Sequence, residues 1–195
     1  MIRIGIIGDI GSGKSYIAQS FGYPVFNADY EVSKLYKQNK NVYQKLKKLL
    51  PEYVYDFPID KNQLTKAILA NNSNLKKITK VIHKEIRLKL KSFLKKNKNK
   101  KFTILDIPLL LENKINTKKD ILIYVDSKNI DIFKNLKKRK NFNIKILKKF
   151  KEIQLPLDYK RKKSNFIIKN KFTKKSVNVE IKKIVKRLKN ERNSS

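Results

Sequence analysis

The chain has 195 residues, enough for one domain with a substantial core, and its 40% hydrophobic content excludes an intrinsically disordered protein. It contains no cysteine, which excludes a disulfide framework and a zinc–thiolate site. The formal net charge of +33 at pH 7 leaves open a polyanionic partner such as nucleic acid. However, basic residues run through nearly every segment, and Lys, Asn and Ile all have AT-rich codons. We therefore favour a compositional origin of the charge and expect no nucleic-acid partner.

Neither the N-terminus nor any later segment predicts export or membrane insertion. The start, "MIRIGIIGDIG", has only a short apolar run followed by polar turn residues, unlike a signal peptide. No apolar run approaches the length that spans a bilayer. We therefore expect a cytoplasmic protein without a membrane partner.

Short apolar runs without alternation predict strands that are covered on both faces. They lie at residues 2–7, 24–27, 102–107, 121–125 and 165–169. Helical patterns separate them, beginning with residues 15–21. Strands that alternate with helices indicate an α/β fold with a five-stranded parallel sheet.

The connection between the second and third strands is too long for a simple crossover. It predicts helices near 30–38, 41–50 and 61–70, the last with Asp60 and Gln63 as an N-terminal capping pair. A longer helix follows, with apolar residues at helical spacing from Leu75 to Phe93. Residues 129–155 form a second helical excursion, and a closing amphipathic helix spans 177–188. We expect the Lys/Asn-rich tracts 95–101 and 189–195 to be solvated loop or tail.

Three of the chain's five glycines lie in "GDIGSGKS", residues 8–15. This stretch fits the P-loop pattern G-x-x-x-x-G-K-[ST], and it follows a predicted strand and precedes a predicted helix. Its backbone N–H groups would cradle phosphate, Lys14 would reach the β and γ phosphates, and the Ser15 hydroxyl would bind Mg²⁺. The alternative is an ordinary glycine-rich turn. The P-loop alone does not separate kinases, GTPases and ATPases.

Further blocks follow in order: "VFNADYEVSKLY", "VIHKEIR", "ILDIPLLLEN", "VD" with "KKR", Gln154 and "SNFIIKN". With them the chain resembles the dephospho-CoA kinase family from residue 2 to about 170. The resemblance implies a P-loop kinase fold with a helical acceptor-side insertion and a lid. It also implies transfer of the ATP γ-phosphate, with Mg²⁺, to the ribose 3′-hydroxyl of dephospho-CoA.

The resemblance further implies roles for single residues. Asp29 matches a carboxylate at the acceptor hydroxyl, and Arg139 matches a lid arginine that stabilises the transferring phosphoryl. Asp29 could instead cap a helix, and Arg139 could be one more solvated cation. His83 and Arg87, one helical turn apart, could line the acceptor side, although His83 could equally be a histidine at the edge of the core.

Weaker assignments complete the site. Asp106 would lie near Mg²⁺, and Asn170 would lie where the family turns around the adenine. The remaining nucleotide-binding candidates are Gly8, Asp9, Ile10, Gly11, Ser12, Gly13 and Tyr16, and the remaining acceptor candidates are Pro108, Leu109 and Glu112. The chain departs from the family pattern at Asp9, Tyr16, Asn27, Lys84 and Asn135.

We therefore predict a single domain, residues 1–195, that phosphorylates dephospho-CoA. Its core comprises about 1–29, 101–128 and 156–195, its acceptor-side insertion about 30–100, and its lid about 129–155. One alternative is another small-molecule or nucleotide kinase. A second is a basic RNA-binding protein that uses ATP as a switch, although the Tyr and Phe residues fall mostly within apolar patterns rather than in stacking clusters.

Overall fold

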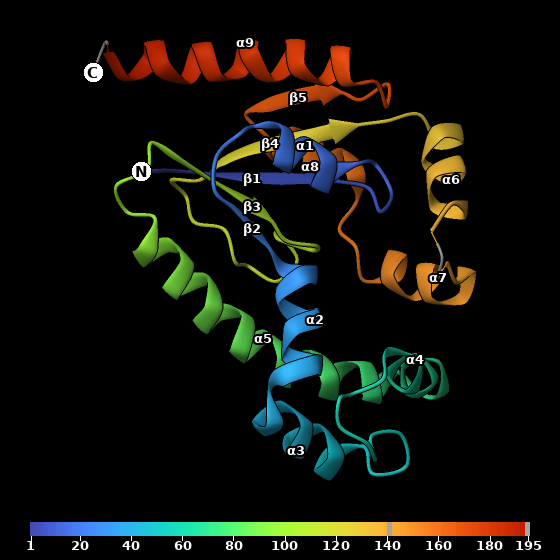
Figure 1. Ribbon diagram of the computed structural model, residues 1–195. Coiled ribbons are helices and arrows are strands. Elements are labelled where there is room, and N and C mark those ends of the chain that lie inside the picture. Colours follow the sequence, from blue (N-terminus) through green and yellow to red (C-terminus); the bar gives the residue numbers. More distant parts are fainter. Residues whose placement is uncertain (140–141, 194–195) are drawn as a thin grey trace. The chain divides into compact units, whose positions relative to one another are not determined.

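The computed structural model describes residues 1–139 and 142–193 (Figure 1). The chain forms two compact units. The sheet unit comprises Met1–Phe26, Asn99–Phe142 and Lys151–Ser195, and the helical unit comprises Asn27–Lys98 and Asn143–Phe150. Both units are assembled from segments that are distant in sequence.

The sheet unit is built on a five-stranded parallel sheet with the strand order β2-β3-β1-β4-β5. Its central strand β1 pairs with β3 on one side and with β4 on the other. The register places Gly5 beside Leu105 of β3 and Gly8 beside Val125 of β4. The strands are β1 (Ile2–Gly8), β2 (Val25–Asn27), β3 (Phe102–Asp106), β4 (Ile121–Asp126) and β5 (Phe166–Lys169).

Apolar side chains bury one face of this sheet beneath two helices. Ile4 and Ile6 of β1 pack in one core cluster with residues of α1 (Lys14–Ser20) and α9 (Lys174–Asn193). Because side chains alternate along a strand, Gly5 faces the other side, where a Cβ would lie 2.6 Å from Leu110 Cδ2. The helix α8 (Leu157–Lys163) packs against β1 and β4, and α9 lies alongside β5 (Figure 1). The sheet unit also contains α6 (Asn129–Lys137).

The helical unit packs around the long helix α5 (Asn72–Lys96). Its apolar stripe of Ile78, Ile82, Ile86 and Leu90 is buried, as the spacing of three and four residues predicts. The helices that pack most extensively against α5 are α2 (Ala28–Gln38), α3 (Lys40–Leu49) and α4 (Lys61–Ala70). The helix α7 (Ile144–Glu152) begins in this unit.

The predicted strands and the insertion helices agree with the structure, with three corrections. Residues 157–163, for which no element was predicted, form α8, and α9 extends through residues 189–193 that were predicted as tail. Asp60 does cap α4 by accepting a hydrogen bond from the Asn62 N–H, but Gln63 Oε1 is buried and has no hydrogen-bond partner among the described residues. The cap is therefore one-sided. No helix in the described ranges has the length and apolarity to cross a bilayer.

Candidate active site

The P-loop follows β1 and adopts backbone conformations that require glycine, as Gly11 and Gly13 illustrate. Gly11 has φ 89° and Gly13 has φ 88°. A Cβ would lie 2.7 Å from Leu136 Cγ at Gly11 and 2.5 Å from Asn170 Nδ2 at Gly13. A side chain at either position would therefore strain the backbone and displace its neighbour. Asp9 has no positive φ, and its Oδ1 accepts a hydrogen bond from the Ile10 N–H at 2.7 Å, so the loop accommodates this departure from the family pattern.

Side chains from several elements hold the carbonyl groups of this loop. The Ser12 carbonyl accepts from Ser127 Oγ at 2.9 Å and from Asn170 Nδ2 at 2.8 Å. The Gly11 carbonyl accepts from Asn135 Nδ2 at 3.2 Å, and the Gly8 carbonyl accepts from Gln154 Nε2 at 3.3 Å. A loop that offers its N–H groups to an anion needs its carbonyls to be satisfied in this way.

One buried polar atom of the loop is left without a partner. Ser12 is fully buried, and its Oγ has no hydrogen-bond partner among the described residues. This hydroxyl lies 3.0 Å from the position that a Cβ of Gly8 would take, so it lies close to the start of the loop. An orphan hydroxyl at this point fits a loop that closes around a ligand oxygen.

Lys14, the first residue of α1, reaches back across the loop. Its Nζ donates to the Asp9 carbonyl at 2.6 Å and to the Gly8 carbonyl at 3.4 Å. Burial lowers the pKa of Lys14 from 10.5 to about 8, and repulsion by Lys160 and Arg139 also lowers it. The Asp106 and Asp9 carboxylates act in the opposite direction. The Lys14 ammonium is thus preorganised in a desolvated place where an anion would strengthen its charged form.

The chemistry of the site fits Mg²⁺ held together with phosphate. Ser15 is exposed at the start of α1, and Asp106 is buried at the end of β3, where its charge acts on Lys14. In the described part of the chain no group of three or more His, Cys, Asp or Glu side chains could hold a metal ion by itself. Mg²⁺ commonly binds one or two protein oxygens and completes its shell with phosphates and water. Ser15 and Asp106 are compatible with that donor set.

The predicted lid arginine, Arg139, and two further predicted nucleotide-binding residues, Asn170 and Tyr16, differ in their surroundings. Arg139 is exposed after α6, and its charge reaches Lys14. Asn170 is only 4% exposed, because its amide binds the Ser12 carbonyl and accepts a hydrogen bond from the Phe172 N–H. Asn170 therefore braces the P-loop directly. Tyr16 is exposed on α1.

The three predicted acceptor residues in the loop after β3 differ in their surroundings. Pro108 is exposed, and Leu109 has φ 55°. Glu112 has a buried side chain that pairs with Lys160 and accepts a hydrogen bond from the Leu155 N–H at 3.0 Å. Glu112 is therefore engaged with α8 and with the residues before it, all within the sheet unit.

In the helical unit, Asp29 lies exposed in the first turn of α2. The N-cap of this helix is Asn27, whose side chain accepts a hydrogen bond from the Tyr30 N–H at 2.7 Å. The alternative that Asp29 is the capping residue is therefore wrong. Burial raises the pKa of the Tyr36 hydroxyl, and the negative charge of Asp29 on the same helix raises it further.

His83 and Arg87 interact on α5, as their spacing predicts. His83 is half-buried and Arg87 is exposed. Burial lowers the pKa of His83 below its usual 6.5, and the positive charge of Arg87 lowers it further. The imidazole is therefore neutral near pH 7, beside an exposed guanidinium that could meet an anion.

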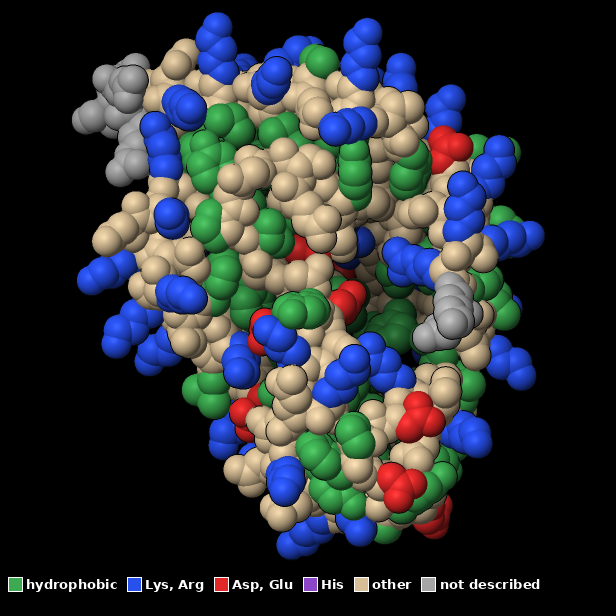
Figure 2. All heavy atoms as spheres, in the orientation of Figure 1, with side chains coloured by type: hydrophobic (Ala, Val, Ile, Leu, Met, Phe, Trp, Pro, Cys, Tyr) green, Lys and Arg blue, Asp and Glu red, His purple; other side chains and the backbone are tan. Residues whose placement is uncertain are grey.

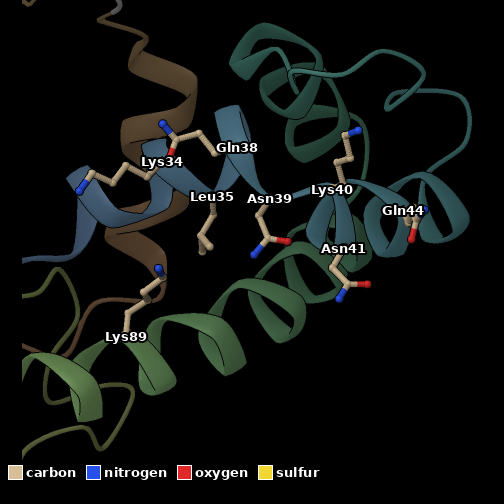
Figure 3. Close-up of a pocket in the computed structure, with 8 residues that line it drawn as sticks. All are labelled: Lys34, Leu35, Gln38, Asn39, Lys40, Asn41, Gln44 and Lys89. Atoms are coloured by element: carbon tan, nitrogen blue, oxygen red, sulfur yellow. The ribbon is translucent and has the colours of Figure 1, made fainter.

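A cavity of about 590 Å³ opens elsewhere on the helical unit (Figure 3). It lies among α2, the start of α3, and α5, from which Lys89 extends toward α2. Lys34 is five residues from Asp29, or about 140° around α2, and Lys89 is about 120° around α5 from His83. The cavity is therefore on another side of both helices than these predicted acceptor residues. Its lining contains Lys34, Leu35, Gln38, Asn39, Lys40, Asn41, Gln44 and Lys89.

Comparison with known proteins resolves which kind of P-loop protein this is. Residues 2–175 match the dephospho-CoA kinase family. The chain belongs to the dephospho-CoA kinase family. It is 35% identical over 187 residues to the dephospho-CoA kinase of Wolbachia pipientis, a match that covers 93% of this chain and 95% of the relative.

Solved structures agree with the predicted α/β P-loop kinase fold, which is confirmed. A Thermus thermophilus protein aligns with a TM-score of 0.77 and 27% identity, covering 94% of this chain and 95% of its own. The dephospho-CoA kinase from Campylobacter jejuni aligns with a TM-score of 0.62 and 23% identity, over 95% of this chain and 96% of its own. The protein is thus an enzyme, a kinase of the dephospho-CoA kinase family.

Sequence reasoning missed several residues that shape the nucleotide site of this dephospho-CoA kinase family member. It gave no role to Ser127 or Lys160, although the first binds the P-loop backbone and the second acts on Lys14. It treated Asn135 only as a departure from a lid arginine, whereas its amide binds the Gly11 carbonyl. Because 49 residues are Lys or Arg, nothing in the pattern distinguishes the one described lysine that is buried, Lys160.

Proposed function

We propose that this protein transfers the γ-phosphate of ATP to the ribose 3′-hydroxyl of dephospho-CoA, giving coenzyme A and ADP. The observation that carries the proposal is a braced P-loop, with Lys14 folded across it, in a chain of the dephospho-CoA kinase family. The proposal also includes a cytoplasmic location. It includes no role for nucleic acid.

The nucleotide side of the reaction follows from the loop. Residues 8–16 would surround the phosphates, with the backbone N–H groups as donors and Lys14 as a charge-assisted donor to the β and γ phosphates. Ser15, and Asp106 through water, would hold Mg²⁺, which would neutralise charge on the phosphate oxygens. Asn170 would keep the loop in shape by its hydrogen bond to the Ser12 carbonyl.

On the acceptor side, Asp29 would orient the 3′-hydroxyl and accept its proton. The hydroxyl oxygen then forms a bond to the γ-phosphorus while the bond from that phosphorus to the β–γ bridging oxygen breaks, and ADP leaves. Arg139 would stabilise the charge on the phosphoryl group during transfer. The roles of Asp29 and Arg139 are supported by the family resemblance.

The acceptor would be held by the segment of about 30–100. His83 and Arg87 are the candidates for its anionic part, and Pro108 and Leu109 for its uncharged part. The segment of about 129–155 would serve as the lid; residues 140 and 141 within it lie outside the described ranges. Glu112 was also predicted at the acceptor, but its Oε1 already pairs with Lys160 and accepts the Leu155 N–H, so we give it a supporting role.

A panel of acceptors tests the proposal. We would measure ADP release and product mass with dephospho-CoA, adenosine, AMP and a short RNA, and use Lys14→Ala as the control for a P-loop-dependent reaction. We expect efficient phosphorylation of dephospho-CoA and poor use of adenosine and AMP, which lack the pantetheine arm. Efficient use of AMP without dephospho-CoA would favour another nucleotide kinase, and stimulation of ATP turnover by RNA would favour an RNA-dependent ATP switch.

A further inference from the structure

Lys160 of α8 is buried, which is unusual for a lysine. It is only 3% exposed, and no other Lys or Arg of the described residues is buried. Lysine is almost never fully buried unless its charge is paired, because removing an ammonium from water is costly. The buried ammonium of Lys160 therefore needs a partner for its charge, and its burial needs a physical explanation.

The partner is Glu112. Its Oε1 contacts Lys160 Nζ and also accepts the Leu155 N–H at 3.0 Å. The side chains of Lys160 and Glu112 are 4% and 8% exposed, so water screens their pairing very little. An ammonium has three donors, and one contact with a carboxylate oxygen leaves donors for another anion.

Residues that precede Lys160 in the chain contact the P-loop. Lys151 Nζ lies 3.6 Å from Asp9 Oδ2, Gln154 Nε2 donates to the Gly8 carbonyl at 3.3 Å, and the next residue, Leu155, binds Glu112. The charge of Lys160 acts on the Lys14 ammonium, together with Asp9, Asp106 and Arg139. Residues 151–160 thus join the start of the P-loop to the buried pair.

A buried ion pair by itself gives little stability, since the cost of desolvation offsets the attraction. Here its cation also repels Lys14. Two ammonium groups in one desolvated site repel each other until a multiply charged anion enters, and such a site is preorganised for that anion. This gives a reason for the burial that stability alone does not give.

We infer that Lys160, held in place by Glu112, is a second phosphate-binding lysine of the nucleotide site and acts together with Lys14 on the polyphosphate. The inference rests on the proposed ATP site but not on the identity of the acceptor. Its ligand is the β and γ phosphates of a nucleoside triphosphate. The contribution of Lys160 to nucleotide binding therefore grows with the number of phosphates. A purely structural ion pair would not give this dependence.

The test is calorimetric binding of AMP, ADP and ATP, without an acceptor, to Lys160→Met. Lys162→Met is the matched control, because Lys162 is an exposed lysine of the same helix. We expect Lys160→Met to weaken ATP binding about tenfold or more, since a hydrogen bond to a charged group is lost, and to weaken AMP binding much less. Lys162→Met should bind all three nucleotides like the wild type.

Circular dichroism and thermal melting establish that the variants are folded. If Lys160→Met does not fold, the double variant Glu112→Gln/Lys160→Met removes both buried charges and takes its place. A folded variant that binds ATP as tightly as the wild type overturns the inference, as does an equal loss for AMP and ATP. Because no acceptor is present, a failure of the proposed reaction with dephospho-CoA would leave this result unchanged.

Discussion

At the start of α2, the helix cap and an exposed carboxylate belong to two different residues. Asn27 accepts the Tyr30 N–H, whereas Asp29 is exposed in the first turn. We predict that Asp29→Asn lowers kcat by about 10²–10⁴, the range for loss of a general base. Its melting temperature should change little, because the cap is intact. Steady-state ADP release and thermal melting measure the two effects.

Asn27→Ala is the matched control for this prediction. It removes the oxygen that accepts the Tyr30 N–H, so unfolding should become easier by about 1 kcal/mol. Asp29→Asn with full activity and unchanged stability would contradict the catalytic role.

The titration of His83 can be measured directly, because the chain contains only one histidine. Burial and then Arg87 lower its pKa below 6.5, so the folded protein resists protonation there. The folded state therefore loses stability as the pH falls from about 6.5 through the lowered pKa, since the unfolded chain binds the proton first. We predict that Arg87→Ala raises the His83 pKa but leaves it below 6.5, because burial remains.

Proton NMR of the imidazole ring measures this pKa without ambiguity of assignment. Lys89→Ala removes another exposed cation of α5 and should leave the titration unchanged. A His83 pKa that does not move in Arg87→Ala would mean that the two side chains are not electrostatic neighbours.

At the scale of elements, the sequence predicted strands and long helices well because each carries a repeated local signal. The strands are short apolar runs, and α5 has its stripe from Ile78 to Leu90. The helix α8 was missed because "LPLDYKRKK" has few apolar residues and gains its place by packing on β1 and β4. The end of α9 differs from the prediction because the Lys/Asn-rich composition of residues 189–195 favours a solvated tail, whereas α9 continues to Asn193.

The candidate site shows the same difference between local patterns, which the sequence reveals, and long-range contacts, which it does not. The P-loop motif predicted the loop, and family blocks suggested Asp29 and Arg139. The bracing of the loop by Asn170 and the pairing of Glu112 with Lys160 join residues that are far apart in sequence. Such contacts have no periodic pattern, so only the folded chain reveals them.

The next prediction concerns Arg139, which follows α6. Arg139 is exposed, and its charge acts on Lys14. Arg139→Lys keeps the charge but loses the planar fork with which an arginine can bind two phosphoryl oxygens. If Arg139 has the proposed role, we predict that kcat falls at least about tenfold while the ATP Kd changes little.

Lys138→Ala is the comparison, because Lys138 is the exposed cation next to Arg139. Steady-state kinetics and calorimetry with ATP separate kcat from binding. Equal effects in Arg139→Lys and Lys138→Ala would indicate a diffuse basic patch rather than one positioned arginine.

At the scale of the whole molecule, the net charge of +33 must be separated from any specific anion site. Lys and Arg side chains spread over the face shown in Figure 2 and do not gather in one patch. A field of this kind attracts every polyanion, and dissolved salt screens it within about 8 Å at physiological ionic strength. A specific acceptor contact must therefore exceed what neighbouring cations contribute.

Arg87 and Lys89 provide that comparison, because both are exposed cations of α5. Arg87 interacts with His83, whereas Lys89 lines the cavity on another side of the helix. We predict that Arg87→Ala raises the KM for dephospho-CoA about tenfold, as loss of a charge-assisted contact requires, and leaves the KM for ATP unchanged. Lys89→Ala should change the acceptor KM only slightly, and raising the salt concentration should remove that change. If both variants behave alike and salt abolishes both effects, the acceptor is attracted by the general field; a larger effect of Lys89→Ala would move the acceptor to the cavity.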